Sequence, residues 1–409
     1  MTALVVQKFG GTSVADADRI REVADYVART VKRGTQVVLV VSAMGKETDD
    51  LLRLADEVST SKAGREMDML ITAGERKATA LVSMAIQDLG VPAVSFTGSQ
   101  AGFITDADHQ NAKIVEVRAE RLRDALDRGA VPVVGGAQGV AGETRDVTFL
   151  GRGGSDTTAV ALAHALDADA CELYTDVSGV FTADPRVVPD ARRMTRISFD
   201  EMLEMTATGC PKPAMRSVEF ARRHGVRLHV RSAFTWEPGT WIEEEDDTME
   251  QAVISAVTHD TSEAKLTIHG VPDRPGIAAR VFRALADDGV NVDMIVQNVS
   301  TGGHTDISFT VPIADLASAR ARCESLGAEI GAAGVEADEN IGRVSVVGAG
   351  MKSNPGVAAT VFEVLAGAGI NIEMISTSAI RISCVVAAPQ VEDAVVALHG
   401  AFRLDEPVG

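Results

Sequence analysis

The chain has 409 residues, a net charge of −19 and a pI of about 4.9. This length predicts two or three domains, and the strong negative charge argues against a surface that binds nucleic acid or anionic membrane. Hydrophobic residues make up 45% of the sequence but aromatic residues only 4%, so the cores must be built from Val, Ala, Leu and Ile, as in α/β proteins.

The four cysteines form no C-x-x-C pair, so the sequence predicts neither a disulfide framework nor a zinc site. The first residues lack the basic and apolar regions of a secretion signal, and no apolar run reaches the length of a membrane span. We therefore expect a reduced, cytoplasmic enzyme. Any anionic ligand has to be bound by local positive groups, because the chain as a whole is acidic.

The first predicted strand begins at Leu4 and ends in a lysine followed by two glycines. Lys8 stands at the carboxyl end of this strand, where open α/β sheets bind ligands, and Gly10 and Gly11 come directly after it. Apolar residues at helical spacing predict a helix next. This order presents backbone N–H groups to phosphate, although the lysine precedes the glycines and the motif is not a Walker A loop. A solvated lysine is the plain alternative.

Three further strands are predicted at 36–42, 91–95 and 131–134, and each ends in small polar residues. With the first strand they indicate one catalytic edge of a mostly parallel sheet. A long helix is expected over about 77–88, and Glu75 lies at a glycine-containing break where a helix kinks or starts. Glu75 is either a solvated acid or a carboxylate for a substrate ammonium group.

The stretch from Leu150 to Thr158 is polar and glycine-rich, and it leads into an Ala-rich helix. Ser155 or Asp156 is expected to cap that helix, and the glycines leave N–H groups exposed at its positive end. Arg152 adds a guanidinium fork that suits a carboxylate or phosphate. The pattern predicts an anion site, and its simpler alternative is a glycine turn with an exposed arginine.

After this loop, a strand is predicted to close on Thr175 and Asp176, followed by a turn-rich loop. Helices are expected at about 198–207 and 214–223, and a strand at 227–231. Residues 236–247 have the composition of a linker, so we expect a domain boundary near them.

The C-terminal part contains a repeat with an offset of 80 residues. The segment from Arg274 to Ile295 recurs as Asn354 to Ile375, and each copy carries a Pro-Gly turn, an amphipathic segment, a glycine stop and a strand. The repeat predicts two βαββαβ units, each with a half-covered sheet.

Several of these motifs resemble one known family. The segments Lys8–Gly11, Thr72–Arg76, Gly151–Thr158 and Tyr174–Val177 are similar to those of the aspartate kinases, a branch of the amino-acid kinase family. Residues 96–102 and 375–378 resemble its actinobacterial members, and the Pro-Gly repeats resemble the paired ACT modules of that family. The resemblance implies a three-layer, open, mostly parallel kinase domain over 1–245 and ACT modules over 246–340 and 341–409.

The resemblance further implies transfer of the γ-phosphoryl group of MgATP to the β-carboxylate of L-aspartate. The product would be 4-phospho-L-aspartate, in the first step of the route to lysine, threonine and methionine. ATP would carry the Mg²⁺, so no metal site of the protein is expected. No general base is needed, because a carboxylate is already a nucleophile at neutral pH.

Residue roles follow from the same resemblance. Lys8 and the Gly10 and Gly11 amides would stabilise the transferred phosphoryl group, and Asp156 would orient Lys8. Other positions divide between the two substrates. The aspartate site would contain Ser42, Thr48, Glu75 for the ammonium, and Arg152, Gly153 and Ser155 for the carboxylate. The ATP site would add Thr175, Asp176, Phe181, Asp184, Arg186 and Lys212.

The effector site that the resemblance implies, for lysine or threonine, lies in the ACT modules. It would comprise Asp273, Gly276, Ile277, Ala278, Asn291, Asp293, Met294, Gln297 and Asn298 of the first module and Ala358, Asn371, Ile372 and Ala379 of the second. The same family implies a homo-oligomer or an α₂β₂-type assembly through these modules, with an internal start near Met249 for the smaller subunit.

The sequence departs from the family pattern in two places. Pro211 occupies the position of a nucleotide-contacting lysine, and Lys212 comes one residue late, which bears on ATP affinity. In the modules, Ile277, Ala358 and Ala379 stand where polar residues are common, so we expect lysine plus threonine to inhibit weakly or not at all. Two alternatives stay open: a relative that phosphorylates another acid such as glutamate, and a catalytically silent amino-acid sensor.

Overall fold

The computed structural model describes residues 3–60, 64–244, 253–298 and 302–406. These residues form two compact units. The first unit comprises residues 3–180, 193–206 and 211–244, and the second comprises 181–192, 207–210 and 253–406, in each case within the described ranges. No helix of the described residues is both long and apolar enough to cross a membrane.

The first unit is built on an eight-stranded sheet with the order β10-β12-β11-β9-β1-β2-β6-β3. Its neighbours pair in parallel except β11 and β12. The central strands are runs of apolar, often β-branched residues, as expected for strands buried on both faces. The strands are β1 (Leu4–Phe9), β2 (Gln36–Val41), β3 (Ala93–Phe96), β6 (Val131–Gly135), β9 (Ala170–Thr175), β10 (Arg196–Ser198), β11 (Leu228–Ser232) and β12 (Thr240–Glu243).

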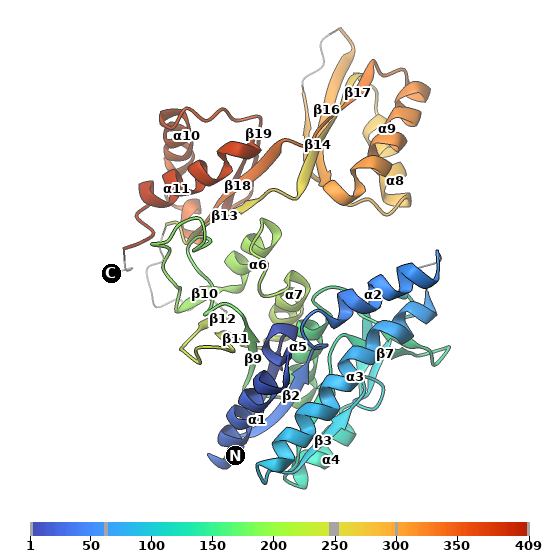
Figure 1. Cartoon of the computed structure of the whole chain (residues 1–409). Coiled ribbons are helices and arrows are strands. Elements are labelled where there is room, and N and C mark those ends of the chain that lie inside the picture. Colours follow the sequence, from blue (N-terminus) through green and yellow to red (C-terminus); the bar gives the residue numbers. More distant parts are fainter. Residues whose placement is uncertain (1–2, 61–63, 245–252, 299–301, 407–409) are drawn as a thin grey trace. The chain divides into compact units, whose positions relative to one another are not determined.

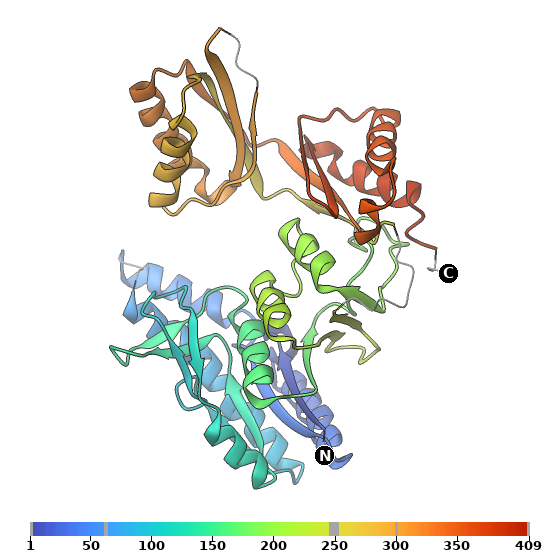
Figure 2. The same ribbon diagram turned by 180° about the vertical axis from the view of Figure 1, so that it is seen from behind.

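Helices lie on both sides of this sheet (Figures 1 and 2). The apolar stripes of α1 (Ala17–Lys32) and α3 (Arg65–Asp88) form one core with the facing side chains of β1, β2 and β6. On the other side α5 (Gly154–Leu166) contacts β1, β2 and β9, and α7 (Met215–His224) packs on α5. The remaining helices of this unit are η1 (Gly11–Val14), α2 (Glu47–Val58), α4 (Glu120–Asp127) and α6 (Phe199–Ala207).

A second, four-stranded sheet of this unit has the order β5-β4-β7-β8 and lies against α3. Its strands are β4 (Phe103–Thr105), β5 (Ile114–Val117), β7 (Gln138–Ala141) and β8 (Val147–Phe149). Strand β8 runs directly into the glycine loop that precedes α5, so this small sheet determines where that loop begins.

The mostly parallel sheet predicted from the sequence is confirmed, but the predicted break at Glu75 is wrong. Helix α3 is continuous from Arg65 to Asp88. Gly74 lies inside it without interrupting it, because the helix passes close to the loop after β2: a Cβ at Gly74 would lie 2.8 Å from the Cβ of Ala43. The glycine therefore permits close packing of a helix and does not end one.

The predicted linker over 236–247 is also wrong in its central part. Strand β12 (Thr240–Glu243) pairs antiparallel with β11 and parallel with β10 in the main sheet. Thr240 and Ile242 are fully buried. The polar residues around them misled the prediction, because only alternate positions of this edge region face the core.

The second unit contains two four-stranded sheets, with the orders β15-β16-β14-β17 and β13-β18-β20-β19. The first module runs β14-α8-β15-β16-α9-β17, which is the predicted βαββαβ order, and its two helices cover one face of the sheet. Its elements are β14 (Glu263–Pro272), α8 (Ile277–Asp287), β15 (Asp293–Gln297), β16 (His304–Pro312), η2 (Ile313–Asp315), α9 (Leu316–Ile330) and β17 (Gly334–Asp338).

The second module takes one strand from outside its own repeat. Strand β13 precedes the first module in sequence, yet it pairs with β18 and occupies the place that β17 has in the first sheet. The elements are β13 (Ala256–Asp260), β18 (Ile341–Val347), η3 (Ala349–Lys352), α10 (Val357–Gly367), β19 (Met374–Thr377), β20 (Arg381–Ala387), η4 (Ala388–Gln390) and α11 (Val391–Ala401). The core of this module also includes Ala183 and Val188 of the segment 181–192.

Candidate active site

A buried ion pair lies at the carboxyl end of β1. The Nζ of Lys8 is 2.5 Å from Oδ1 of Asp156, in the first turn of α5, and each residue is only 6% exposed. The Ala214 amide donates to the other carboxylate oxygen at 3.2 Å. Burial by itself raises the pKa of Asp156, but the Lys8 ammonium outweighs it and holds the pKa below its usual value. Asp156 is therefore ionised at neutral pH.

The start of α5 differs from the sequence-based prediction. Its N-cap is Gly153, which has φ of 70° and no side chain to cap with, so the prediction that Ser155 or Asp156 caps the helix is wrong. Asp156 is drawn away because Lys8 offers it a full charge, which a backbone N–H group does not. The N-cap residue thus provides no side-chain hydrogen bond at the positive end of α5.

Gly10 and the end of β9 lie beside the end of β1 that carries Lys8. A Cβ at Gly10 would lie 3.6 Å from the Lys8 ammonium, although the Gly10 amide already donates to the Tyr174 carbonyl at 3.3 Å. At the end of β9, Thr175 donates to the Asp176 carboxylate at 2.8 Å. Burial opposes ionisation of Asp176, but this bond and the charges of Lys212 and Lys8 keep its pKa below the usual value.

Glu75 lies on α3 and is only 3% exposed. Burial raises its pKa to about 7, with a further small increase from the charge of Glu47, while hydrogen bonds from the backbone, including that of Ala43, oppose this change. Its buried Oε2 has no hydrogen-bond partner among the described residues. A buried carboxylate oxygen without a donor is ready for a cationic ligand.

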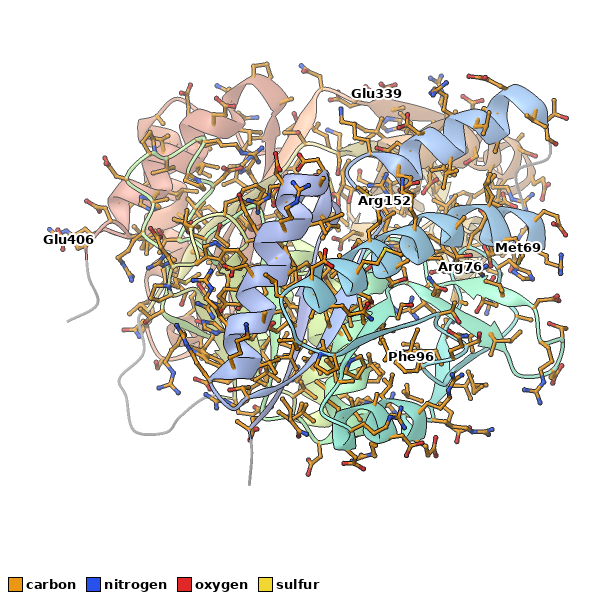
Figure 3. All side chains as sticks on the ribbon, turned by 60° about the horizontal axis from the view of Figure 1, so that its bottom comes forward. Met69, Arg76, Phe96, Arg152, Glu339 and Glu406 are labelled. Carbon is orange, nitrogen blue, oxygen red and sulfur yellow. The ribbon has the colours of Figure 1, made fainter. Side chains whose placement is uncertain are left out.

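The loop between β8 and α5, with the first turn of that helix, carries Arg152, Gly153 and Ser155, which the sequence predicts for the substrate carboxylate. Arg152, labelled in Figure 3, has an exposed side chain, whereas Ser155 is nearly buried and lies directly against Gly136 in the turn after β6. Ser42 follows β2 and is half-buried, and Thr48 is in the first turn of α2. Gly135, in the same turn as Gly136, lies against the Glu75 side chain. The turn therefore touches both Glu75 and Ser155.

Three predicted nucleotide residues, Phe181, Asp184 and Arg186, belong to the second unit. There, Arg186 forms an ion pair with Asp184 at 2.6 Å. Hydrogen bonds from Arg186 lower the pKa of the Asp184 carboxyl. Burial of the adjoining Ala183 and Val188 in the second ACT module fixes this segment.

The predicted effector residues lie on the Pro-Gly turns and edge strands of the two modules. Asp293 is engaged by Arg343, at 2.6 Å, and Met294, with φ of 47°, is buried between the modules with Met374. Ile277 packs in part on the module core. The other predicted positions are partly or fully exposed: Asp273, Gly276, Ala278, Asn291, Gln297, Asn298, Ala358, Asn371, Ile372 and Ala379.

Sequence reasoning missed several residues of the site. It noted the Gly-rich turn over 135–139 but gave it no role, and it passed over Glu47, which forms an ion pair with Lys77 at 2.6 Å close to Glu75. The signal available was the small polar composition of each strand end. That composition does not show which strand ends lie together in the folded chain.

Comparison with known proteins identifies the family of nearly the whole chain. The amino acid kinase family matches residues 3–232, more than half of the chain, and the ACT domain matches residues 266–325 and 344–402. The aspartokinases of Mycolicibacterium smegmatis and Corynebacterium glutamicum are 57% and 53% identical, over 98% of this chain and 96% of each relative. These two relatives confirm the actinobacterial resemblance.

Solved structures agree with the sequence matches. E. coli aspartokinase III in complex with aspartate and ADP, in its R-state, is 25% identical with a TM-score of 0.82, over 97% of this chain and 99% of that one. The same protein with lysine and aspartate, in its T-state, is 26% identical with a TM-score of 0.75, over 98% and 99%. The chain therefore belongs to the amino acid kinase family, within the aspartokinases that carry ACT domains.

Proposed function

We propose that Lys8, Asp156, Glu75 and Arg152 carry the aspartokinase reaction in this chain. In that reaction the γ-phosphoryl group of ATP passes to the β-carboxylate of L-aspartate and gives 4-phospho-L-aspartate. The observation that supports the assignment most directly is the buried pair of Lys8 and Asp156 beside Gly10. Asp156 fixes the ammonium in place, so its remaining N–H groups stabilise the charge that spreads over the transferred group.

Glu75 binds the substrate ammonium in this proposal. Its carboxylate is buried, its pKa is raised to about 7, and one oxygen lacks a partner. An ammonium group satisfies that oxygen and returns the pKa toward the usual range, because a nearby positive charge favours the ionised carboxylate. Ser42 and Thr48 complete the aspartate site in this proposal.

Arg152, Gly153 and Ser155 bind the α-carboxylate. Arg152 is exposed on a loop that ends at the positive end of α5, so its guanidinium and the helix N–H groups face the same anion. The β-carboxylate then attacks ATP directly, since it is ionised at neutral pH and needs no base. Catalysis is chiefly positioning and charge neutralisation.

In this proposal ATP enters as its Mg²⁺ complex and is bordered by Gly11, Thr175, Asp176 and Lys212. Phe181, Asp184 and Arg186, which the sequence predicts for the same ligand, belong to the second unit. The charge of Lys212 helps to keep the pKa values of Asp156 and Asp176 low. This supports a role for Lys212 at the nucleotide even though it follows Pro211, the position of the usual lysine.

Regulation and assembly belong to the same proposal. Lysine and threonine bind at the Pro-Gly turns of ACT modules that span 246–340 and 341–409, with β13 contributed to the second. The modules join copies of the chain, because the edge strands β15 and β19 expose Ile295 and Ile375 at equivalent positions, 54% and 45% exposed. Met249, the proposed internal start, lies outside the described residues.

A trapping assay tests the reaction. The chain is incubated with MgATP and L-aspartate, hydroxylamine converts the acyl phosphate to a hydroxamate, and ferric iron makes the hydroxamate visible as a coloured complex. L-Glutamate in place of aspartate tests the alternative substrate. Hydroxamate with aspartate alone supports the proposal; hydroxamate with glutamate alone favours the alternative, and none with either acid favours a silent sensor.

A further inference from the structure

We propose that Asp68 and His109 are positioning residues for aspartate binding, because they hold the loop that carries Arg152. The inference rests on the proposed role of Arg152 and names two residues outside the site described above. Asp68 lies in the first turn of α3, and His109 lies in the connection between β4 and β5 of the small sheet.

Asp68 is fully buried and accepts three hydrogen bonds from two separate segments. The Gln110 amide donates to Oδ1 at 3.0 Å, and the Phe149 amide and the His109 ring donate to Oδ2 at 3.0 and 2.7 Å. A carboxylate can only accept, so Nδ1 of His109 carries the hydrogen. Hydrogen bonds to a charged group are about twice as strong as neutral ones. This buried cluster therefore joins α3 firmly to the 109–110 segment and to the end of β8.

The residues that Asp68 holds lie next to the loop that carries Arg152. Phe149 is the last residue of β8 and is separated from Arg152 by only Leu150 and Gly151. Gln110 has φ of 67°, a backbone conformation that is uncommon for a residue other than glycine. The hydrogen bond from its amide to Asp68 helps to hold this conformation. Its carbonyl is so close to Gly151 that a Cβ there would lie 2.9 Å from it.

Arg216 joins the same two segments by a second set of hydrogen bonds. Arg216 donates to the carbonyls of Leu150 and Ala112, both at 2.8 Å, and the Ala112 amide donates to the Phe149 carbonyl at 3.0 Å. The 109–112 segment and the start of the loop are therefore one hydrogen-bonded body. Asp68 joins that body to α3, the helix that also carries Glu75, so the ammonium and carboxylate subsites keep a fixed separation.

The test compares two substitutions of His109 by steady-state kinetics in the full-length chain. His109→Leu removes the donor, whereas His109→Asn keeps an N–H group close to the position of Nδ1. We expect His109→Leu to raise the aspartate KM about tenfold, the effect of one charge-assisted hydrogen bond, and to change kcat and the ATP KM little. His109→Asn should restore most of the aspartate affinity. Asp68→Asn should have a larger effect, because its NH₂ group opposes a backbone donor.

Arg152→Ala supplies the reference. In that background His109→Leu should add almost nothing to the aspartate KM, because the group that it positions is gone. Arg118→Ala, which removes an exposed side chain of the same small sheet, is the matched control and should leave all constants unchanged.

The outcomes distinguish a failure of this inference from a failure of the proposed function. If Arg152→Ala raises the aspartate KM but His109→Leu does not, this inference is overturned and the proposed function stands. Equal rises in the KM of aspartate and of ATP, or an undiminished His109 effect in Arg152→Ala, would also overturn it by showing general loosening. If Arg152→Ala leaves the aspartate KM unchanged, the proposed role of Arg152 is wrong, and this inference is wrong with it. Should Asp68→Asn not fold, the His109 pair alone decides.

Discussion

Lys8 of the first unit and Arg343 of the second are both buried cations, and their carboxylate partners hold them differently. In the first unit Lys8 faces a single carboxylate, that of Asp156, at 2.5 Å. In the second unit the Arg343 side chain is 2% exposed and faces three carboxylates within 3.5 Å, those of Asp260, Glu263 and Asp293.

This difference separates an ammonium with N–H donors to spare from a guanidinium whose two terminal nitrogens are both engaged. A lysine ammonium has three N–H donors, and Asp156 needs only one. Arg343 is surrounded by three carboxylates and also donates to the Ala207 carbonyl at 2.9 Å, so its planar fork ties together segments distant in sequence. The first cluster is suited to chemistry and the second to structure.

Removal of Arg343 should give the largest loss of stability. Arg343→Ala leaves three carboxylates together with no cation, and we expect a loss of about 3–5 kcal/mol in the free energy of unfolding. Chemical denaturation measures it. The control is Arg320→Ala, which breaks the exposed pair with Glu324 and should cost less than about 1 kcal/mol. Equal stability of the two variants would contradict a structural role for Arg343.

Removal of Lys8 should act mainly on the reaction. Lys8→Ala is expected to lower kcat about 10²- to 10³-fold, as loss of one stabilising donor does. It also leaves Asp156 buried without its cation, so stability falls. The double variant Lys8→Met with Asp156→Leu should recover stability but not kcat. A double variant that regains both would show that the pair is structural, like Arg343.

The pH dependence of aspartate binding should report Glu75. Its pKa, about 7 in the folded chain, means that the ionised form that binds an ammonium fills as pH rises through 7. The aspartate KM should therefore fall about tenfold per pH unit below pH 7 and level off above it. Glu75→Gln should have a high KM with no such step. A step of the same size in Glu75→Gln would assign the titration to another group.

The same carboxyl should affect stability with the opposite sign. The folded chain holds the Glu75 proton over the range from its ordinary pKa of 4.5 up to about 7. Its stabilising contribution is thus complete below pH 4.5 and is lost as pH rises through about 7. Glu75→Gln should lose less stability than the unmodified chain between pH 6 and 8. Thermal melts at the two pH values measure this.

Effector inhibition should show the smallest change. Ala358 and Ala379 offer no polar side chain, and Ile277 packs in part on the module core, so lysine plus threonine should inhibit weakly or not at all. Ala379→Glu with Ile277→Glu should restore inhibition in part, about fivefold at most. Initial rates with each amino acid alone and with both decide it, and strong concerted inhibition of the unmodified chain would contradict the prediction.

The amino-acid sequence by itself determined the local patterns. The apolar run that begins at Leu4 and the runs at 36–42, 91–95 and 131–134 predicted the parallel strands, and the offset of 80 residues predicted two modules of one design. The glycines around Lys8 and Arg152 predicted a turn after the first strand and a loop before an Ala-rich helix. These inferences succeeded because strand patterns, glycine turns and repeats are written in residues close together in the chain.

Tertiary structure decided what depends on distant partners. Helix α3 packs closely on Ala43, in the loop after β2, through Gly74. Strand β12 joins the main sheet between β11 and β10, and β13 pairs with β18, far from it in sequence. Asp156 pairs with a lysine 148 positions earlier rather than capping its own helix. Hydrogen-bond partners and close packing across such separations are set by which surfaces meet in the folded chain, and no local pattern records them.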